Sequence, residues 1–303
     1  MIETRDDIFH LCTANTSLLF RSTDLAGHPE LIHYGARVSR EDAAALAVKR
    51  AVPYGCAVNY SADDPIYSLD AIPLLFSGAG RGDYRESPVE LESAVGRATD
   101  FTYKSHEVRS GIAPLEGMPQ ARGGDETLVL TLEDKAAGAE LTLYFTVFEA
   151  ADVITRRAVL TNTGDTPIAV RKLMSQMLDL PGTFVMTTFN GAHIAEARRL
   201  DTPVGEARVV NEAVTGFSSN RHNPGFLLSE PGAGEDHGRV YGFNLVWSGN
   251  HYASAQRQKT AIVSCLQRIA QVVPAEHHYL FELIIHGVRG GQESHRERQN
   301  YRE

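Results

Sequence analysis

The sequence predicts an all-β protein in which antiparallel sheets pack as a sandwich. The dominant hydrophobic period is two residues, not 3.6, which is typical of strands with one buried face. Short strand-like runs follow one another closely, separated by turn-forming residues. Strand and helix patterns do not alternate along the chain, which argues against a Rossmann fold or a TIM barrel. We therefore expect short antiparallel strands and few helices.

The clearest hairpin pattern lies near the middle of the chain. Leu128, Leu130 and Leu132 alternate with other residues, and alternation resumes in residues 141–147 after a turn-like segment. Residues 153–161 predict the next strand, which ends at an Asn-Thr-Gly-Asp turn. Four further strands are predicted, over residues 8–11, 17–20, 30–34 and 239–248.

One short helix is predicted near residues 40–50. Ser39 and Asp42 resemble a capping box, and the apolar, helix-favouring residues 43–48 follow them. Pro53 lies beyond the predicted helix and favours its termination.

Composition restricts the class of protein and its partners. The chain has 303 residues and a formal net charge of −9, which argues against partners such as nucleic acid or an anionic membrane surface. The polar, acidic start does not resemble a signal peptide, and no apolar run approaches the ~20 residues of a membrane helix. Cys12, Cys56 and Cys265 are widely spaced and predict reduced thiols. We expect a cytoplasmic protein.

The common motifs for cofactor and metal binding are absent from the sequence. There is no Walker A motif, no His-Glu-x-x-His and no Gly-x-Ser-x-Gly. The adjacent His277 and His278 would point to opposite faces of a strand, so they do not predict a metal site. We expect no cofactor and no bound metal.

Dense runs of charged, polar, aromatic and glycine residues carry the main functional signal. They occupy residues 82–88, 103–119, 218–224 and 235–252. Loops at sheet ends can bring such groups together, where they could bind the hydroxyls of a sugar or could satisfy buried backbone groups.

In this order and spacing, these runs resemble the N-terminal domain of glycoside hydrolase family 36, the bacterial α-galactosidases. Further similar runs lie at residues 9–17, 152–156, 161–164, 178–181 and 188–192. The resemblance covers about residues 8–254. It implies an antiparallel β-supersandwich of the galactose mutarotase-like type, whose partners are α-galactoside sugars, a following catalytic barrel and further copies in a homo-oligomer.

The resemblance also implies that the catalytic residues lie outside this segment. Family members are retaining hydrolases with two aspartates on a (β/α)₈ barrel, one of them in a Lys-Trp-Asp motif. The single tryptophan here, Trp247, precedes Ser248, and a barrel needs about 250 residues. We therefore expect no catalytic residue in the chain and no hydrolysis by the chain alone.

The resemblance suggests which residues could line the rim of a sugar pocket. The family commonly has Gly-Ala-Trp where this chain has Gly191-Ala192-His193, so His193 replaces a tryptophan that resembles a pocket wall. The other candidates are the well-matched polar residues Asp83, Arg85, Asn223 and Asn250. His106 and Asp236 also match well, and a loop-fixing role is an alternative for most of this group.

Two domains of different character are expected, a sandwich over residues 1–255 and an atypical tail over residues 256–303. Past Ala255 the resemblance fades, and the chain ends in a charged, polar stretch. We expect this tail to fray and to leave an unpaired sheet edge. A frameshift or a truncated reading frame is a hypothesis for its origin.

Two functions of other classes remain open. A free-standing carbohydrate-binding module would bind sugar without a barrel. A mutarotase-like sugar epimerase would use His193 or His222 next to a carboxylate, within about 3 Å of the proton transferred.

Overall fold

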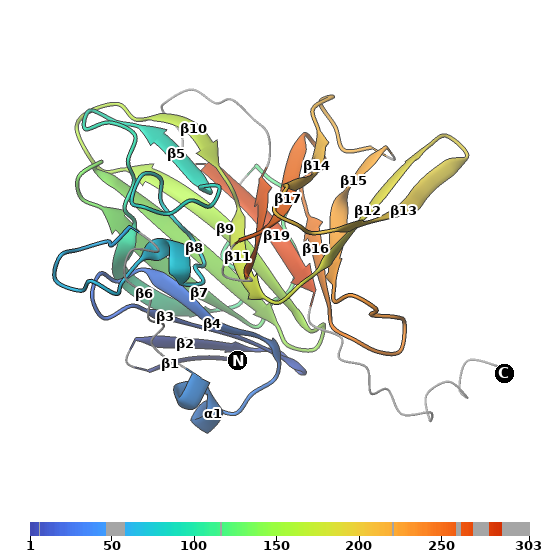
Figure 1. Cartoon of the computed structure of the whole chain (residues 1–303), viewed down its shortest axis with the longest axis horizontal. Helices are drawn as coiled ribbons and strands as arrows, with labels where there is room; N and C mark the ends of the chain where they lie inside the picture. The colour runs from blue at the N-terminus through green and yellow to red at the C-terminus, as the bar shows by residue number, and fades with distance from the viewer. Residues whose placement is uncertain are drawn as a thin grey trace.

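The strands of the computed structural model form four antiparallel sheets (Figure 1). The structure describes residues 1–5, 7–46, 58–115, 117–219, 221–258, 262–268 and 279–286. The N-terminal sheet has the order β1 (Ile2–Arg5), β2 (Ile8–Cys12), β3 (Thr16–Ser22) and β4 (Pro29–Ala36). A two-stranded ribbon joins β10 (Ala169–Leu173) to β5 (Val89–Glu92).

The largest sheet has nine strands, and a second four-stranded sheet lies beside it. The nine-stranded sheet has the order β13 (Ala195–Pro203), β12 (Val185–Ala192), β15 (His222–Ser229), β16 (Val240–Leu245), β19 (Tyr279–His286), β9 (Val153–Asn162), β8 (Ala139–Phe148), β7 (Glu126–Asp134) and β6 (Thr102–Ser110). The second four-stranded sheet has the order β11 (Gln176–Pro181), β18 (Ile262–Arg268), β17 (His251–Arg257) and β14 (Val209–Ala213).

The predicted alternation builds the core. Leu128, Leu130 and Leu132 on β7 are all buried, as are the alternating apolar residues of β8. Phe20 of the N-terminal sheet stacks on Phe9 at 4.9 Å between ring centroids and reaches Phe145 of β8 at 5.5 Å. The N-terminal sheet therefore packs against the nine-stranded sheet, and Figure 1 shows β3 and β4 next to β7 and β8. The sandwich prediction is confirmed.

The predicted helix is confirmed at its start. Helix α1 spans Arg40–Leu46, and the Ser39 hydroxyl accepts the backbone N–H of Asp42 at 3.2 Å while donating to its carboxylate at 2.7 Å. The first of these bonds satisfies one of the free backbone N–H groups at the N-terminus of the helix, as an N-cap does. Residues 47–57, including the predicted C-terminal end of the helix, lie outside the described residues. No helix in the described ranges is long and apolar enough to cross a membrane.

The expectation of an unpaired sheet edge in the tail is wrong for two of its segments. Strand β18 pairs with β11 on one side and β17 on the other. Strand β19 pairs along its whole length with β9 and also with β16. Both strands are therefore interior. Each forms hydrogen-bonded ladders with a strand on either side, although polar residues surround it in the sequence. Apart from residues 256–258, the rest of the tail lies outside the described residues.

Candidate functional site

Arg85 and Asp83 form a buried ion-pair cluster with Asp179 of β11. The Asp83 carboxylate accepts hydrogen bonds from Nε and Nη2 of Arg85, both at 2.8 Å. The Nη1 group donates to the Ile72 carbonyl at 2.8 Å and to Asp179, and Nη2 also donates to the Leu69 carbonyl. All five N–H groups of the guanidinium are thus engaged.

This geometry supports a loop-fixing role for Asp83 and Arg85. Their side chains are 0% and 1% exposed. Burial alone would lower the pKa of Arg85, but Asp179 and Asp83 together raise it above its ordinary value. A fully engaged and buried guanidinium has no donor left for a sugar hydroxyl. The sequence analysis gave Asp179 no role, although a carboxylate within an apolar strand signals a buried partner.

Asn223 and Asn250 each bond to a nearby backbone amide. The Asn223 side-chain oxygen accepts the N–H of Gly225 at 2.8 Å, at the exposed start of β15. The Asn250 oxygen accepts the N–H of Gly216 at 2.6 Å and joins two loops. Gly216 has φ +95°, which only glycine adopts easily. Both asparagines thus hold turns, and their amide nitrogens are the groups that a ligand could use.

His193 lies at the tip of the β12–β13 hairpin, which projects from the body of the protein (Figure 1). His193 is exposed, and the next residue, Ile194, is 84% exposed with φ +67°. Such a backbone conformation is strained for a β-branched residue. The Ile194 amide donates to the Glu196 carboxylate at 3.1 Å, and this bond helps to hold the turn. Of the five predicted site residues, His193 is the one most freely presented to a partner.

The two other matched polar residues lie apart from this hairpin. His106 is exposed on β6, where its Nδ1 lies 2.8 Å from the Tyr103 hydroxyl and its ring meets Phe9 edge-on at 5.0 Å. Asp236 is exposed in the turn between β15 and β16. The structure therefore does not gather the predicted residues into one pocket.

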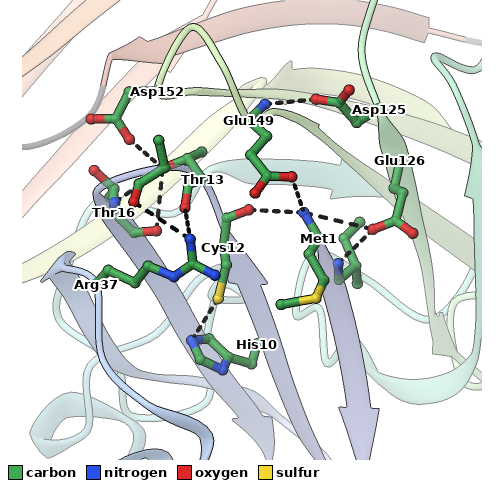
Figure 2. A network of polar contacts seen from close by, with 12 residues as sticks. Met1, His10, Cys12, Thr13, Thr16, Arg37, Asp125, Glu126, Glu149 and Asp152 are labelled. Atoms are coloured by element: carbon green, nitrogen blue, oxygen red, sulfur yellow. Dashed lines mark hydrogen bonds and ion pairs between the residues drawn. The ribbon is translucent and has the colours of Figure 1, made fainter.

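Two runs that carried the family resemblance meet around Thr13, as Figure 2 shows. The Asp152 carboxylate accepts the Thr13 hydroxyl and the backbone N–H of Asn15, the latter at 3.2 Å. Arg37 donates to the Thr13 carbonyl at 3.0 Å. Asp152 has φ +55°. These contacts join the β2–β3 turn to the β8–β9 turn, which explains why polar residues occur in both.

Figure 2 also shows a cysteine beside a histidine. The Cys12 sulfur lies 3.0 Å from Nε2 of His10, which lies 2.9 Å from the Ser17 hydroxyl. The cysteine and histidine are two residues apart on one strand and so share a face, a signal present in the sequence. Burial raises the pKa of the Cys12 thiol and lowers that of His10. Both shifts oppose a thiolate–imidazolium pair, so the site does not resemble a cysteine nucleophile.

The histidine-based alternative finds no support in the described parts of the chain. There, neither His193 nor His222 makes a hydrogen bond or ion pair with a carboxylate. The described residues also contain no group of three or more side chains that could hold a metal ion. The geometry therefore does not favour a mutarotase-like epimerase.

His251 is a buried histidine that the sequence analysis did not single out. Its side chain is fully buried at the start of β17, and neither ring nitrogen has a partner in the described structure. Burial, with a smaller contribution from His222, lowers the pKa of His251 to about 4. The ordinary histidine pKa is 6.5, so between these values the unfolded chain takes up a proton that the folded chain does not.

We therefore expect the free energy of unfolding to fall as the pH is lowered from 6.5 toward 4. Urea unfolding of the natural chain and of His251→Leu at neutral pH and in this acid range would measure the effect. The acid-induced loss should be smaller in His251→Leu, whereas His106→Gln, at an exposed site, should behave like the natural chain. An equal loss in all three proteins would contradict the assignment to His251.

Comparison with known proteins gives the family. The model of the glycosyl hydrolase family 36 N-terminal domain matches residues 27–274. The chain belongs to this family. The bifunctional α-galactosidase/sucrose kinase AgaSK of Mediterraneibacter gnavus is 32% identical over 261 residues, which are 83% of this chain and 27% of that protein. Alpha-galactosidase C of Emericella nidulans is 30% identical over 263 residues, 85% of this chain and 34% of the relative.

Solved structures give the same result for the fold of this family 36 domain. The galactosidase domain of AgaSK superposes with a TM-score of 0.88 at 29% identity, covering 96% of this chain and 42% of that one. An α-galactosidase of Geobacillus stearothermophilus in complex with stachyose gives 0.86 at 25% identity, covering 94% of this chain and 41% of that structure. Of the two curated relatives described above, the chain spans about a quarter to a third of the length.

The match to the family model continues beyond Ala255. It ends at residue 274, so the expected loss of family similarity after residue 255 is wrong for the following segment. The frameshift hypothesis and the division at residue 255 stay predictions.

Proposed function

We propose that this chain acts as the non-catalytic N-terminal β-sandwich of an α-galactosidase-like glycoside hydrolase. The observation that carries the proposal is the match of nearly the whole chain to the N-terminal part of family 36 proteins. The parent reaction would be retaining hydrolysis of terminal α-galactosides, which needs two carboxyl groups about 5–5.5 Å apart on a rigid frame. The Lys-Trp-Asp motif expected for one of them does not occur in this sequence.

In this proposal the sandwich packs against a catalytic barrel and the β12–β13 hairpin reaches the rim of the sugar pocket. Strand β13 is an edge strand and is exposed along nearly its whole length. Leu200 on this strand and Ile194 in the turn before it add exposed apolar surface, at 54% and 84%. Exposed apolar side chains of this kind favour contact with a partner. His193, at the hairpin tip, is the residue we place next to the substrate.

The purified chain should not hydrolyse an aryl α-galactoside above the rate in buffer. Adding it to a family 36 barrel that lacks its own N-terminal domain should raise the activity of the barrel, and the two proteins should co-elute. In this pair, His193→Ala should preserve co-elution and raise KM. Turnover by the chain alone that survives repurification would contradict the non-catalytic role. Absence of both co-elution and rescue would contradict the docking role.

The cellular setting and the assembly state are part of the same proposal. We place the protein in the cytoplasm, where a reducing environment would keep a thiol such as the buried, free Cys12 reduced. We also propose a homo-oligomer, as the resemblance to the family implies. Cell fractionation and light scattering coupled to size-exclusion chromatography test these two statements.

A further inference from the structure

A cavity of about 290 Å³ opens between the N-terminal sheet and the segment that precedes β5. Its inner wall includes Glu30, Tyr67 and Ile72, which are buried, and Asp24 and Leu25 beside it are exposed. The cavity therefore has a buried wall and a mouth toward solvent. Its volume is near the lower end of the range of about 300–1,000 Å³ that small-molecule pockets occupy. A ligand of one sugar ring matches this size.

One wall of the cavity is a buried ion pair between neighbouring strands. Arg21 of β3 lies opposite Glu30 of β4 in the sheet register. The Arg21 Nε group donates to the Glu30 carboxylate at 2.8 Å, and the two side chains are 16% and 5% exposed. This pair sets a charged donor next to a charged acceptor. Sugar hydroxyls both donate and accept hydrogen bonds, so they can use both groups.

A second part of the lining is fixed by a chain of hydrogen bonds. The Tyr67 hydroxyl lies 2.9 Å from the Thr23 hydroxyl and 2.9 Å from Nδ1 of His28. Nε2 of His28 lies 2.9 Å from the Asp100 carboxylate. Because the carboxylate accepts, Nε2 carries a hydrogen, and in the neutral ring Nδ1 then accepts a hydrogen bond from the Tyr67 hydroxyl. The tyrosine is thus held in place before any ligand enters, which reduces the entropy lost on binding.

The charge of the lining selects among ligand classes. Asp24, Glu30 and Asp64 set three carboxylates against the single guanidinium of Arg21, which disfavours an anionic ligand. Within the described residues no cluster of side chains could hold a metal ion. Tyr67, with the aliphatic side chains in the lining, offers apolar surface to the C–H face of a ring. A neutral, hydroxylated ring matches both the polar and the apolar parts of the lining.

We propose that this cavity binds one monosaccharide unit, with the Arg21–Glu30 pair bonding its hydroxyls. The choice of galactose as the first probe rests on the proposed function. The class of ligand rests on the lining alone. The cavity would allow the isolated chain to bind sugar without a barrel.

Saturation-transfer NMR of the full 303-residue chain with galactose, glucose and putrescine tests the proposal. Galactose or glucose should bind saturably, with a dissociation constant on the order of 1 mM. Glu30→Gln should weaken this binding about tenfold or more, because a charged acceptor is lost. Glu230→Gln is the matched control, since Glu230 also pairs with an arginine, Arg239. These two residues lie just beyond the paired ends of β15 and β16, far along the chain from the cavity.

A second variant keeps the proposal testable if Glu30→Gln fails to fold. Leu25 is 42% exposed at the mouth, so Leu25→Trp should block entry and leave the buried ion pair intact. Absence of saturable sugar binding, binding unchanged in both variants, or tighter binding of putrescine than of either sugar would overturn the proposal. Leu25→Trp should still rescue a barrel, so failure of the cavity and failure of the proposed function can be told apart.

Discussion

A chain shortened to residues 1–278 is expected to lose its cooperative fold. The deletion removes β19, which lies between β9 and β16 and pairs with both. Two interior strands would then expose backbone groups that were hydrogen-bonded, at a cost of about 1–3 kcal/mol for each one that stays buried without a partner. Several such losses together are comparable to the 5–15 kcal/mol that stabilises a typical domain. Circular dichroism and urea unfolding measure the outcome.

A chain of residues 1–290 is the matched control, because it keeps both β18 and β19. It should unfold cooperatively, whereas the 1–278 chain should aggregate or show no transition. If both chains unfold with the same midpoint, residues 279–286 are not integral to the sheet, and the prediction of an atypical tail over residues 256–303 gains support.

Replacing Arg85 with methionine is expected to lower the free energy of unfolding by about 3–5 kcal/mol. The substitution leaves Asp83 and Asp179 in the interior without their counter-charge, and both side chains are 0% exposed. It also removes the donors to the backbone carbonyls of Leu69 and Ile72. Urea unfolding at neutral pH, monitored by circular dichroism, gives the difference directly.

Arg239→Met provides the comparison at an exposed ion pair. Arg239 is 45% exposed and pairs with Glu230, and such surface pairs contribute about 0–1 kcal/mol. The triple variant Arg85→Met, Asp83→Asn and Asp179→Asn should recover part of the lost stability, because it removes the uncompensated charges. A loss in Arg85→Met no larger than that in Arg239→Met would contradict the buried ion-pair assignment.

Local patterns explain why much of the fold could be predicted. The alternation of Leu128, Leu130 and Leu132 is a property of neighbouring residues, and it directly indicates one buried face. The start of α1 could be predicted for the same reason, since Ser39 and Asp42 lie within one turn. The pairing of His10 with Cys12 was equally local and could have been predicted from their spacing.

Long-range contacts explain what could not be predicted. The partners of Asp179 include Arg85 and the backbone amide of Leu74, about a hundred residues earlier in the sequence. Nothing in the spacing of these residues shows that they meet. The same holds for the chain of contacts from Tyr67 through His28 to Asp100, which joins three separate segments.

The tail shows how composition can mislead. Residues 279–286 read Tyr-Leu-Phe-Glu-Leu-Ile-Ile-His, an apolar run typical of an interior strand. The polar residues on both sides of this run instead predict a frayed tail. A strand in the middle of a sheet pairs on both sides, and the composition of the flanking residues does not indicate whether those two pairings form.

The sequence by itself determined the all-β class, the central hairpin, the start of the helix and the family. These depend on local periodicity and on residues conspicuous in type and order. Only the tertiary structure decided that Asp83 and Arg85 are buried among their partners, that His193 projects on a hairpin, and that β18 and β19 are interior strands. The physical reason is that burial and ion pairing are set by contacts between distant segments, which the order of residues does not display.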